Sequence, residues 1–261
     1  MQFDFSNKTV ILTGALGSIG TAISFRFLQA GANVVVSDIQ AGPSHERSEQ
    51  LLPFAGQYIY VQCDISSMTQ CEELCAAAIA RFGRVDILIN NAGINTGADQ
   101  RVNIGEYDQD IWKRIIDVNL NGVYYCSSPV IKQMLKQGGG RIVNIGSVAG
   151  HVPLRLQSAY AVAKSGIHHM TKTMALELAE QGIYVNAVLP GSIMNDQTRT
   201  LFYQNEQKNA SLMAHIPMHR PGTPEEIATA VMFLSDDDAS YINGSLLIVD
   251  GGWTCGYARD W

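Results

Sequence analysis

The sequence predicts an α/β fold with a doubly wound, parallel, seven-stranded sheet that carries helices on both faces. Short runs rich in Val and Ile alternate along the chain with longer amphipathic stretches. Uninterrupted apolar runs of this kind are typical of strands buried on both faces. Helical stretches between successive strands favour parallel crossover connections. The length of 261 residues, 46% of them hydrophobic, is enough for one large core.

The expected elements follow from this alternation in chain order. Each strand is a short apolar run that ends in a small or polar residue, and each helix is the amphipathic stretch that follows. The strands are expected at residues 9–14, 33–38, 58–64, 85–91, 141–147, 184–191 and 245–252. The helices are expected at residues 19–30, 66–82, 109–136, 158–181 and 224–235. Pro129 predicts a kink or local irregularity inside the third of these helices.

No linker, low-complexity tract or repeat divides the chain, so residues 1–261 are expected to form a single domain. The stretch 192–222 is polar, mixed and long, and it follows a strand end. Such insertions are typical of lids and binding loops, and a plain surface loop is the alternative.

Composition excludes several classes of function. The net charge is −6 and no run of Lys or Arg stands out, so no nucleic-acid partner is expected. No apolar stretch approaches the roughly 20 residues of a membrane span, and the first residues lack the apolar core of a signal peptide. The five cysteines show no paired spacing and no nearby His, which predicts reduced thiols, a cytoplasmic location and no metal site.

A glycine-rich turn follows the first strand. The segment TGALGSIG spans residues 13–20 and opens the first helix, where backbone N–H groups and the positive helix end can hold a diphosphate. Asp38 ends the next strand, at the place where a carboxylate accepts both ribose hydroxyls of NAD and repels a 2′-phosphate. Alternatively, the turn is an ordinary tight connection and the acid is only solvated. Together they favour binding of a dinucleotide.

With this glycine-rich turn and Asp38, the chain resembles the short-chain dehydrogenase/reductase family, in its single-domain branch with a Rossmann fold. The family's loop reads TGxxxGxG, and Thr13, Gly14, Ile19 and Gly20 match it. Ser18 stands where the middle glycine is found, and Gly17 precedes it. NADP-preferring relatives often carry Arg or Lys at the position of Gly17. The resemblance therefore implies NAD as the cofactor.

The same resemblance extends over the whole chain and implies further cofactor contacts. The segment CDI resembles the family's adenine contact, and the segment NNAG resembles the part beside the adenosine ribose. The segment PGSI resembles the part beside the nicotinamide, where Asn195 replaces a Thr found in many relatives and can make a similar hydrogen bond. The residues implied are Asp64, Ile65, Asn91, Ala92, Gly93, Pro190, Gly191 and Ile193.

Four residues are the expected catalytic set. Tyr160 and Lys164 lie four residues apart, on one face of an expected helix. Such a pair also arises by chance, but Ser147 ends a buried strand and Asn119 lies on the preceding helix. The resemblance implies that these four act together. Lys164 would lower the pKa of Tyr160 and hold the nicotinamide ribose, Ser147 would hold the substrate oxygen, and Asn119 would hold a water.

The substrate residues are less specific. The pocket is expected from the loops 94–104, 148–159 and 192–222, which are rich in polar residues, with the C-terminus as a further candidate. Asn95, His151, Arg155 and Asn195 are the candidates, and solvated loop residues are the alternative. Arg155 would clamp a carboxylate, order a hydroxyl or form a salt bridge at a subunit surface. A polar lining suits a hydroxylated substrate better than a steroid or a fatty chain.

These observations favour an NAD-dependent oxidoreductase that interconverts an alcohol and a ketone on a polyol, sugar or sugar acid. The alternatives are a 3-oxoacyl-thioester reductase and, in another class, a non-catalytic nucleotide-binding sensor. The resemblance implies a homotetramer paired through the two long helices and the last strand. The aromatic tail GWTCGYARDW is expected to anchor a subunit interface.

Overall fold

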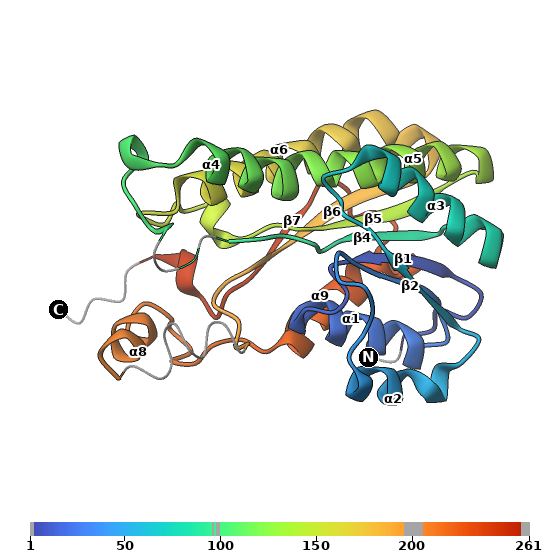
Figure 1. Cartoon of the computed structure of the whole chain (residues 1–261), viewed down its shortest axis with the longest axis horizontal. Helices are drawn as coiled ribbons and strands as arrows, with labels where there is room; N and C mark the ends of the chain where they lie inside the picture. Colours follow the sequence, from blue (N-terminus) through green and yellow to red (C-terminus); the bar gives the residue numbers. More distant parts are fainter. Residues whose placement is uncertain (1–2, 96, 98–99, 196–205, 257–261) are drawn as a thin grey trace.

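The computed structural model describes residues 3–95, 97, 100–195 and 206–256. This part of the chain forms one parallel sheet with the strand order β3-β2-β1-β4-β5-β6-β7, as Figure 1 shows. The expected seven-stranded, doubly wound sheet is confirmed. The strands are β1 (Thr9–Thr13), β2 (Asn33–Asp38), β3 (Tyr58–Gln62), β4 (Ile87–Asn90), β5 (Gly140–Ile145), β6 (Ile183–Pro190) and β7 (Leu246–Val249).

Helices cover both faces of the sheet (Figure 1). One face carries α1 (Ser18–Gln29), α2 (His45–Leu51) and α9 (Pro224–Ser235). The other carries α3 (Met68–Phe82), α4 (Gln109–Ile116), α5 (Gly122–Gln137) and α6 (Ser158–Leu178). Short 3₁₀ turns are η1 (Leu52–Phe54), η3 (Ile104–Glu106), η5 (Val148–Gly150), η6 (Ala179–Gln181), η8 (Asp237–Ala239) and η9 (Trp253–Cys255).

Alternation along each strand creates two apolar layers. In β1, Val10 and Leu12 belong to the layer under α1 and α9, whereas Ile11 belongs to the layer under α3 and α5. All three side chains are fully buried. Because the side chains of a strand point to opposite faces in turn, a continuous Val/Ile run is needed to fill both layers.

The long helix expected at 109–136 is divided. A π-helical turn at Asp117–Asn121 separates α4 from α5, while the chain stays α-helical through Pro129. The irregularity predicted at Pro129 is not found, since α5 continues across it, and the π-helical turn is a separate feature that the sequence did not predict. The side-chain amide of Asn119 donates to the carbonyl oxygen of Ile115, four residues back, at 3.0 Å. Since that carbonyl is the normal partner of the Asn119 backbone N–H, the side chain competes with the helix ladder.

Two short helices were not expected, α2 and α8 (Glu206–Met213), and α8 lies inside the insertion 192–222. Both ends of this insertion meet at one place. Gly222 donates to the Ser192 carbonyl, and Met194 donates to the Gly222 carbonyl, each at 2.9 Å. The lid role stays a prediction, and residues 196–205 lie outside the described part. Among the described helices, none has the length and apolar character needed to cross a membrane.

Candidate active site

The central strands β1 and β4 lie side by side, and the connections that follow them leave in opposite directions. Such a switch point opens a crevice at the carboxyl ends of the strands. A cavity of about 570 Å³ lies there. The expected adenosine and diphosphate residues all line it: Gly14, Gly17, Ser18, Ile19, Gly20, Asp38, Asp64, Ile65, Asn91, Ala92 and Gly93.

Neighbouring backbone lies so close to two glycines of the turn that a side chain on either would force the backbone to move. Gly14 has a φ of +61°, and a Cβ there would lie 2.6 Å from the Cα of Ala92. A Cβ on Gly20 would lie 2.2 Å from the Gly14 carbonyl oxygen. Gly17 has room, because its nearest neighbour would be 3.5 Å away. Ser18 is the exposed first residue of α1, so the exchange of the middle glycine leaves the close approaches intact.

The turn is tied to the end of β4. The Thr13 hydroxyl oxygen accepts hydrogen bonds from the backbone N–H groups of Asn91 and Ala92, both at 3.1 Å. In return, the Asn91 amide donates to the carbonyl oxygens of Thr13 and Gly14 at 3.0 and 2.9 Å. These reciprocal bonds fix the turn before any ligand arrives. Glycines that leave space for a phosphate, beside a helix start, fit a dinucleotide cofactor.

Asp38 also makes contacts within the protein that the sequence did not reveal. Its carboxylate accepts the backbone N–H of Leu16 in the glycine turn at 3.0 Å and that of Gln40 at 3.3 Å. The side chain is 8% exposed and lines the cavity. Asp38 therefore holds the glycine turn against the end of β2, in the position where the ribose contact was predicted.

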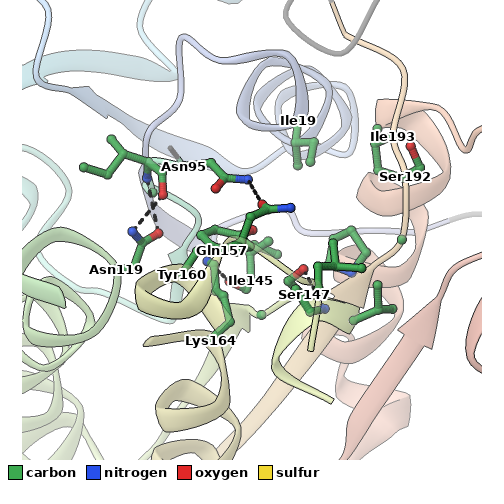
Figure 2. Close-up of a pocket in the computed structure, with 18 of the residues that line it drawn as sticks. Ile19, Asn95, Asn119, Ile145, Ser147, Gln157, Tyr160, Lys164, Ser192 and Ile193 are labelled. Carbon is green, nitrogen blue, oxygen red and sulfur yellow. Dashed lines mark hydrogen bonds between the residues drawn. The ribbon is translucent and has the colours of Figure 1, made fainter. Parts of the chain in front are cut away.

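A second cavity, of about 520 Å³, adjoins the first and shares Ile19, Asn91, Gly93, Ile94 and Asn195 with it. Ser147, in the turn after β5, and Tyr160 and Lys164, in α6, face this cavity, as Figure 2 shows. The remaining residues implied for the catalytic set and the nicotinamide also line it: Asn119, Pro190, Gly191 and Ile193. The fold thus brings together residues that lie more than 70 positions apart in the sequence.

Lys164 is buried and Tyr160 is half-buried, and desolvation shifts their pKa values in opposite directions. Burial raises the pKa of Tyr160, while the Ser147 hydroxyl acts to lower it. Burial lowers the pKa of Lys164 to about 8. The Lys164 Nζ lies 5.7 Å from the Tyr160 ring centroid and donates to the Ile145 carbonyl at 2.8 Å. The expected lowering of the Tyr160 pKa by Lys164 is therefore not seen here, because desolvation of the phenol dominates.

A chain of buried side chains holds α6 against the sheet behind this site. The Asn90 amide donates to the Asn144 oxygen at 2.8 Å, and the Asn144 amide donates to the Thr171 hydroxyl at 2.9 Å. The Thr171 hydroxyl in turn donates to the Ile167 carbonyl. Since α6 carries Tyr160 and Lys164, this network fixes the direction of their approach.

Asn119 is fully buried in the π-helical turn and serves the neighbouring loop. Its amide donates to the Ile94 carbonyl at 2.8 Å, and its oxygen accepts the Ile94 N–H at 3.2 Å. Figure 2 shows these bonds. Asn119 is thus a positioning residue for the chain after β4, and the water that it was expected to hold stays a prediction.

Three of the four candidate substrate residues line the second cavity. Asn95, Arg155 and Asn195 line the second cavity, whereas His151 is exposed and is not among the lining residues. Trp253, in the aromatic tail, also lines the cavity, and the role of the tail at a subunit interface stays a prediction. Residues 257–261 of the tail lie outside the described part. The expected pocket loops also contribute lining residues that were not among the four candidates: Arg101, Leu154, Gln157 and Leu212.

Ser147, Tyr160 and Lys164 together can carry out proton transfer at an oxygen that is bonded to the reacting carbon. The Tyr160 phenol would exchange the proton, and the Ser147 hydroxyl would hold the same oxygen by a neutral hydrogen bond. A nicotinamide cofactor, when bound, supplies or accepts the hydride. Lys164, at the base of the cavity, would supply positive charge near the phenol.

Comparison with known proteins agrees with this geometry. A family model described as enoyl-(acyl carrier protein) reductase matches residues 14–254. The 3-oxoacyl-[acyl-carrier-protein] reductase FabG of Thermotoga maritima is 36% identical and aligns over 94% of this chain and 97% of its own. Glucose 1-dehydrogenase 2 of Bacillus subtilis is 35% identical over 97% of each chain. A crystal structure of a short-chain type dehydrogenase/reductase from Mycobacterium marinum has a TM-score of 0.89 and 30% identity, and 98% of each chain is covered.

The chain belongs to the short-chain dehydrogenase/reductase family. Within it, the protein is an NAD(P)-dependent oxidoreductase that acts on CH–OH or carbonyl groups.

Proposed function

We propose that the protein uses NAD to interconvert an alcohol and a ketone on a small hydroxylated substrate, in the class of polyols, sugars and sugar acids. The observation that carries the proposal is the position of Ser147, Tyr160 and Lys164 in a cavity continuous with the one that Asp38 lines. A complete proton-transfer set disfavours a non-catalytic nucleotide sensor, which would need only the first cavity.

The preference for NAD rests on Asp38. Its carboxylate is nearly buried at the end of β2, and a 2′-phosphate near it would bring two negative charges together in a poorly solvated place. Arg114 also lines this cavity, but it comes from α4, next to Val118, and not from the glycine turn. Gly17 has no side chain that could attract the extra phosphate.

The substrate class rests on the lining of the second cavity. Asn95, Gln157 and Asn195 place amide groups in it, and amides can both donate to and accept from hydroxyls. The similarity to a glucose 1-dehydrogenase supports a sugar. Leu154, Leu212 and Trp253 make the lining more apolar than the loop sequences indicate.

Reduction of a 3-oxoacyl thioester is the second candidate. The similarity to the Thermotoga maritima reductase favours it, and the apolar side chains of Leu154, Leu212 and Trp253 suit an acyl chain. Asp38 disfavours this candidate, because that reduction usually uses NADPH and the Asp38 carboxylate would repel the 2′-phosphate of NADPH.

A panel of steady-state assays separates the two. Polyols, aldoses and sugar acids with NAD, and acetoacetyl thioesters with NADH and NADPH, would be compared by kcat/KM. The proposal expects the first group with NAD to be used best, and by at least about tenfold over NADP. Faster reduction of the thioester with NADPH would select the second candidate.

We further propose a cytoplasmic homotetramer that forms through α5, α6 and β7. Large apolar side chains on these elements are exposed in the single chain, namely Tyr124, Leu176 and Ile248. Exposed apolar groups of this size favour burial between subunits. Light scattering at micromolar concentration tests the assembly, and a monomeric mass would contradict it.

A further inference from the structure

Two arginine side chains, Arg101 and Arg155, line the cavity that contains Ser147 and Tyr160. They come from different loops, one after β4 and one between η5 and α6. A guanidinium stays protonated in proteins and matches a carboxylate with two parallel N–H donors. We propose that Arg155 and Arg101 bind a carboxylate of the substrate, so that hydroxy acids are preferred over neutral alcohols and sugars. This inference deepens the proposed function and rests on it.

Arg155 has donors to offer a ligand. Its side chain is exposed, and no hydrogen bond or ion pair joins it to another residue within the described part of the chain. It nevertheless lines the cavity. A guanidinium at the rim of a cavity, with its donors directed to no protein group, can bind an anion without first breaking an internal contact.

The backbone that carries Arg155 is held in one conformation. Leu156, the next residue, has a φ of +66°, a left-handed conformation that a leucine seldom adopts. Gln157 is 6% exposed, and its side-chain oxygen accepts the Asn95 amide at 3.0 Å (Figure 2). Strained residues persist where surrounding contacts fix them, and they cluster at ligand sites. The loop that bears Arg155 is therefore tied to the loop after β4.

Arg101 contributes positive charge from inside the wall. It is half-buried, so the guanidinium is partly removed from water, and this burial lowers the pKa of Arg101. A partly desolvated cation attracts an anion more strongly than an exposed one does. Lys164 is a third basic group in the lining, and none of the lining residues in the described ranges is Asp or Glu. The second cavity thus favours an anionic ligand.

The size of the second cavity points to a compact acid. About 520 Å³ must hold the substrate together with the nicotinamide end of the cofactor. The apolar side chains of Leu154, Leu212 and Trp253 can pack on a carbon skeleton. A substrate with its carbinol at Tyr160 and its carboxylate at the arginines would satisfy both kinds of lining.

Matched pairs of substrates test the inference. D-glucuronate is compared with D-glucuronamide, and cis-4-hydroxycyclohexanecarboxylate with its carboxamide, since each pair differs in charge and hardly in shape. The acid is expected to exceed the amide in kcat/KM by at least about tenfold. Arg155→Ala should raise KM for the acid about 10- to 100-fold and leave KM for the amide and NAD affinity unchanged. Arg155→Lys, which keeps the charge but loses the fork, should recover part of the loss.

Arg101→Ala should give a change in the same direction, and Arg81→Ala is the matched control. Arg81 lies at the end of α3, exposed, where it donates to the Gly56 carbonyl, away from both cavities. Its removal should change neither substrate of a pair. Equal use of acid and amide by the parent enzyme, or an unchanged KM for the acid in Arg155→Ala, would overturn the inference. A clear preference for D-glucose 6-phosphate over the acids would overturn the assignment to a carboxylate.

A binding measurement distinguishes this inference from the proposed function. Cyclohexanecarboxylate and cyclohexanecarboxamide, which cannot be oxidised here, are titrated into the enzyme with NADH, and the nucleotide fluorescence is followed. If no alcohol in any assay is oxidised with NAD, the proposed function fails. Tighter binding of the carboxylate that is lost in Arg155→Ala would still support the anion site, whereas equal binding of acid and amide would reject it.

Discussion

The two cavities are built in different ways, although they share a wall. The first cavity, proposed for the cofactor and called here the cofactor cavity, is made by strand ends and the glycine turn. Reciprocal hydrogen bonds join Thr13 and Asn91, and the Leu16 N–H donates to the Asp38 carboxylate. The second cavity, proposed for the substrate and called here the substrate cavity, has one rigid wall, formed by β5 and α6. It is otherwise enclosed by loops and by single residues such as Leu212 and Trp253. The difference teaches that the cofactor site is part of the scaffold, whereas specificity is carried by segments that can vary without changing the sheet.

The largest effect should come from a change on the rigid wall of the substrate cavity. Tyr160→Phe is expected to lower kcat at least about a thousandfold, because the proton can no longer be exchanged at the substrate oxygen. NADH binding, followed by fluorescence, should stay within about twofold of the parent, since the cofactor cavity is untouched. Lys164→Ala should impair both, because the Lys164 Nζ lies close to Gly93, a residue that lines both cavities. A Tyr160→Phe enzyme that keeps most of its rate would require another base.

On the cofactor side, two glycines of the same turn provide a matched pair. Gly20→Ala should weaken NADH binding about 10- to 100-fold, because its Cβ would overlap the Gly14 carbonyl and the turn must shift, at about 1–3 kcal/mol. Gly17→Ala should bind NADH within about twofold of the parent, since its Cβ meets only an ordinary contact. Isothermal titration of both variants measures the difference. Equal affinities would mean that the turn is not the rigid cradle described above.

The preference between cofactors is expected to depend on one carboxylate. Asp38→Ala should reduce the preference for NAD over NADP from at least about tenfold to near unity, because the repulsion of the 2′-phosphate is removed. Asp64→Asn is the control: it alters an acid of the same cavity whose oxygen accepts from Ser66. The ratio of the two kcat/KM values is the measurement, and it stays valid even if loss of the Leu16 contact weakens both cofactors. An unchanged ratio in Asp38→Ala would assign the preference to other residues.

The smallest expected effect is a shift in pH dependence. Alcohol oxidation requires the ionised Tyr160, whose pKa burial raises, so kcat/KM for oxidation should increase with pH into the alkaline range. The Ser147 hydroxyl favours the ionised phenol, so Ser147→Ala should move this rise to higher pH by about one unit, in addition to lowering the rate. Ser147→Thr, which keeps a hydroxyl, should leave the midpoint in place. A shift to lower pH in the Ala variant would show that Ser147 does not stabilise the phenolate.

Much of the fold and of the cofactor site could be predicted because the relevant signals are local. A Val/Ile run predicts a buried strand, and a glycine turn between strand and helix predicts a phosphate site. Parallel strands place all their carboxyl ends at one edge, so Asp38, Asn91 and Ser147 had to lie near one another. The four-residue spacing of Tyr160 and Lys164 placed them on one helix face. For this reason, the residues expected around the adenosine and diphosphate all line the cavity.

The sequence by itself therefore determined the sheet, the glycine turn and the shared helix face of Tyr160 and Lys164, because each depends on neighbours in the chain or on the rule that joins parallel strands. Only the tertiary structure decided which loop residues face the substrate. Arg101, Leu212 and Trp253 come from three distant segments, and no spacing brings them together. It also decided the direction of the Tyr160 pKa, since desolvation is the sum of everything packed around the phenol. The π-helical turn at Asp117–Asn121 was likewise decided by the tertiary structure. The Asn119 side chain, which lies in this turn and bonds to the Ile115 carbonyl, also bonds to Ile94 in another loop.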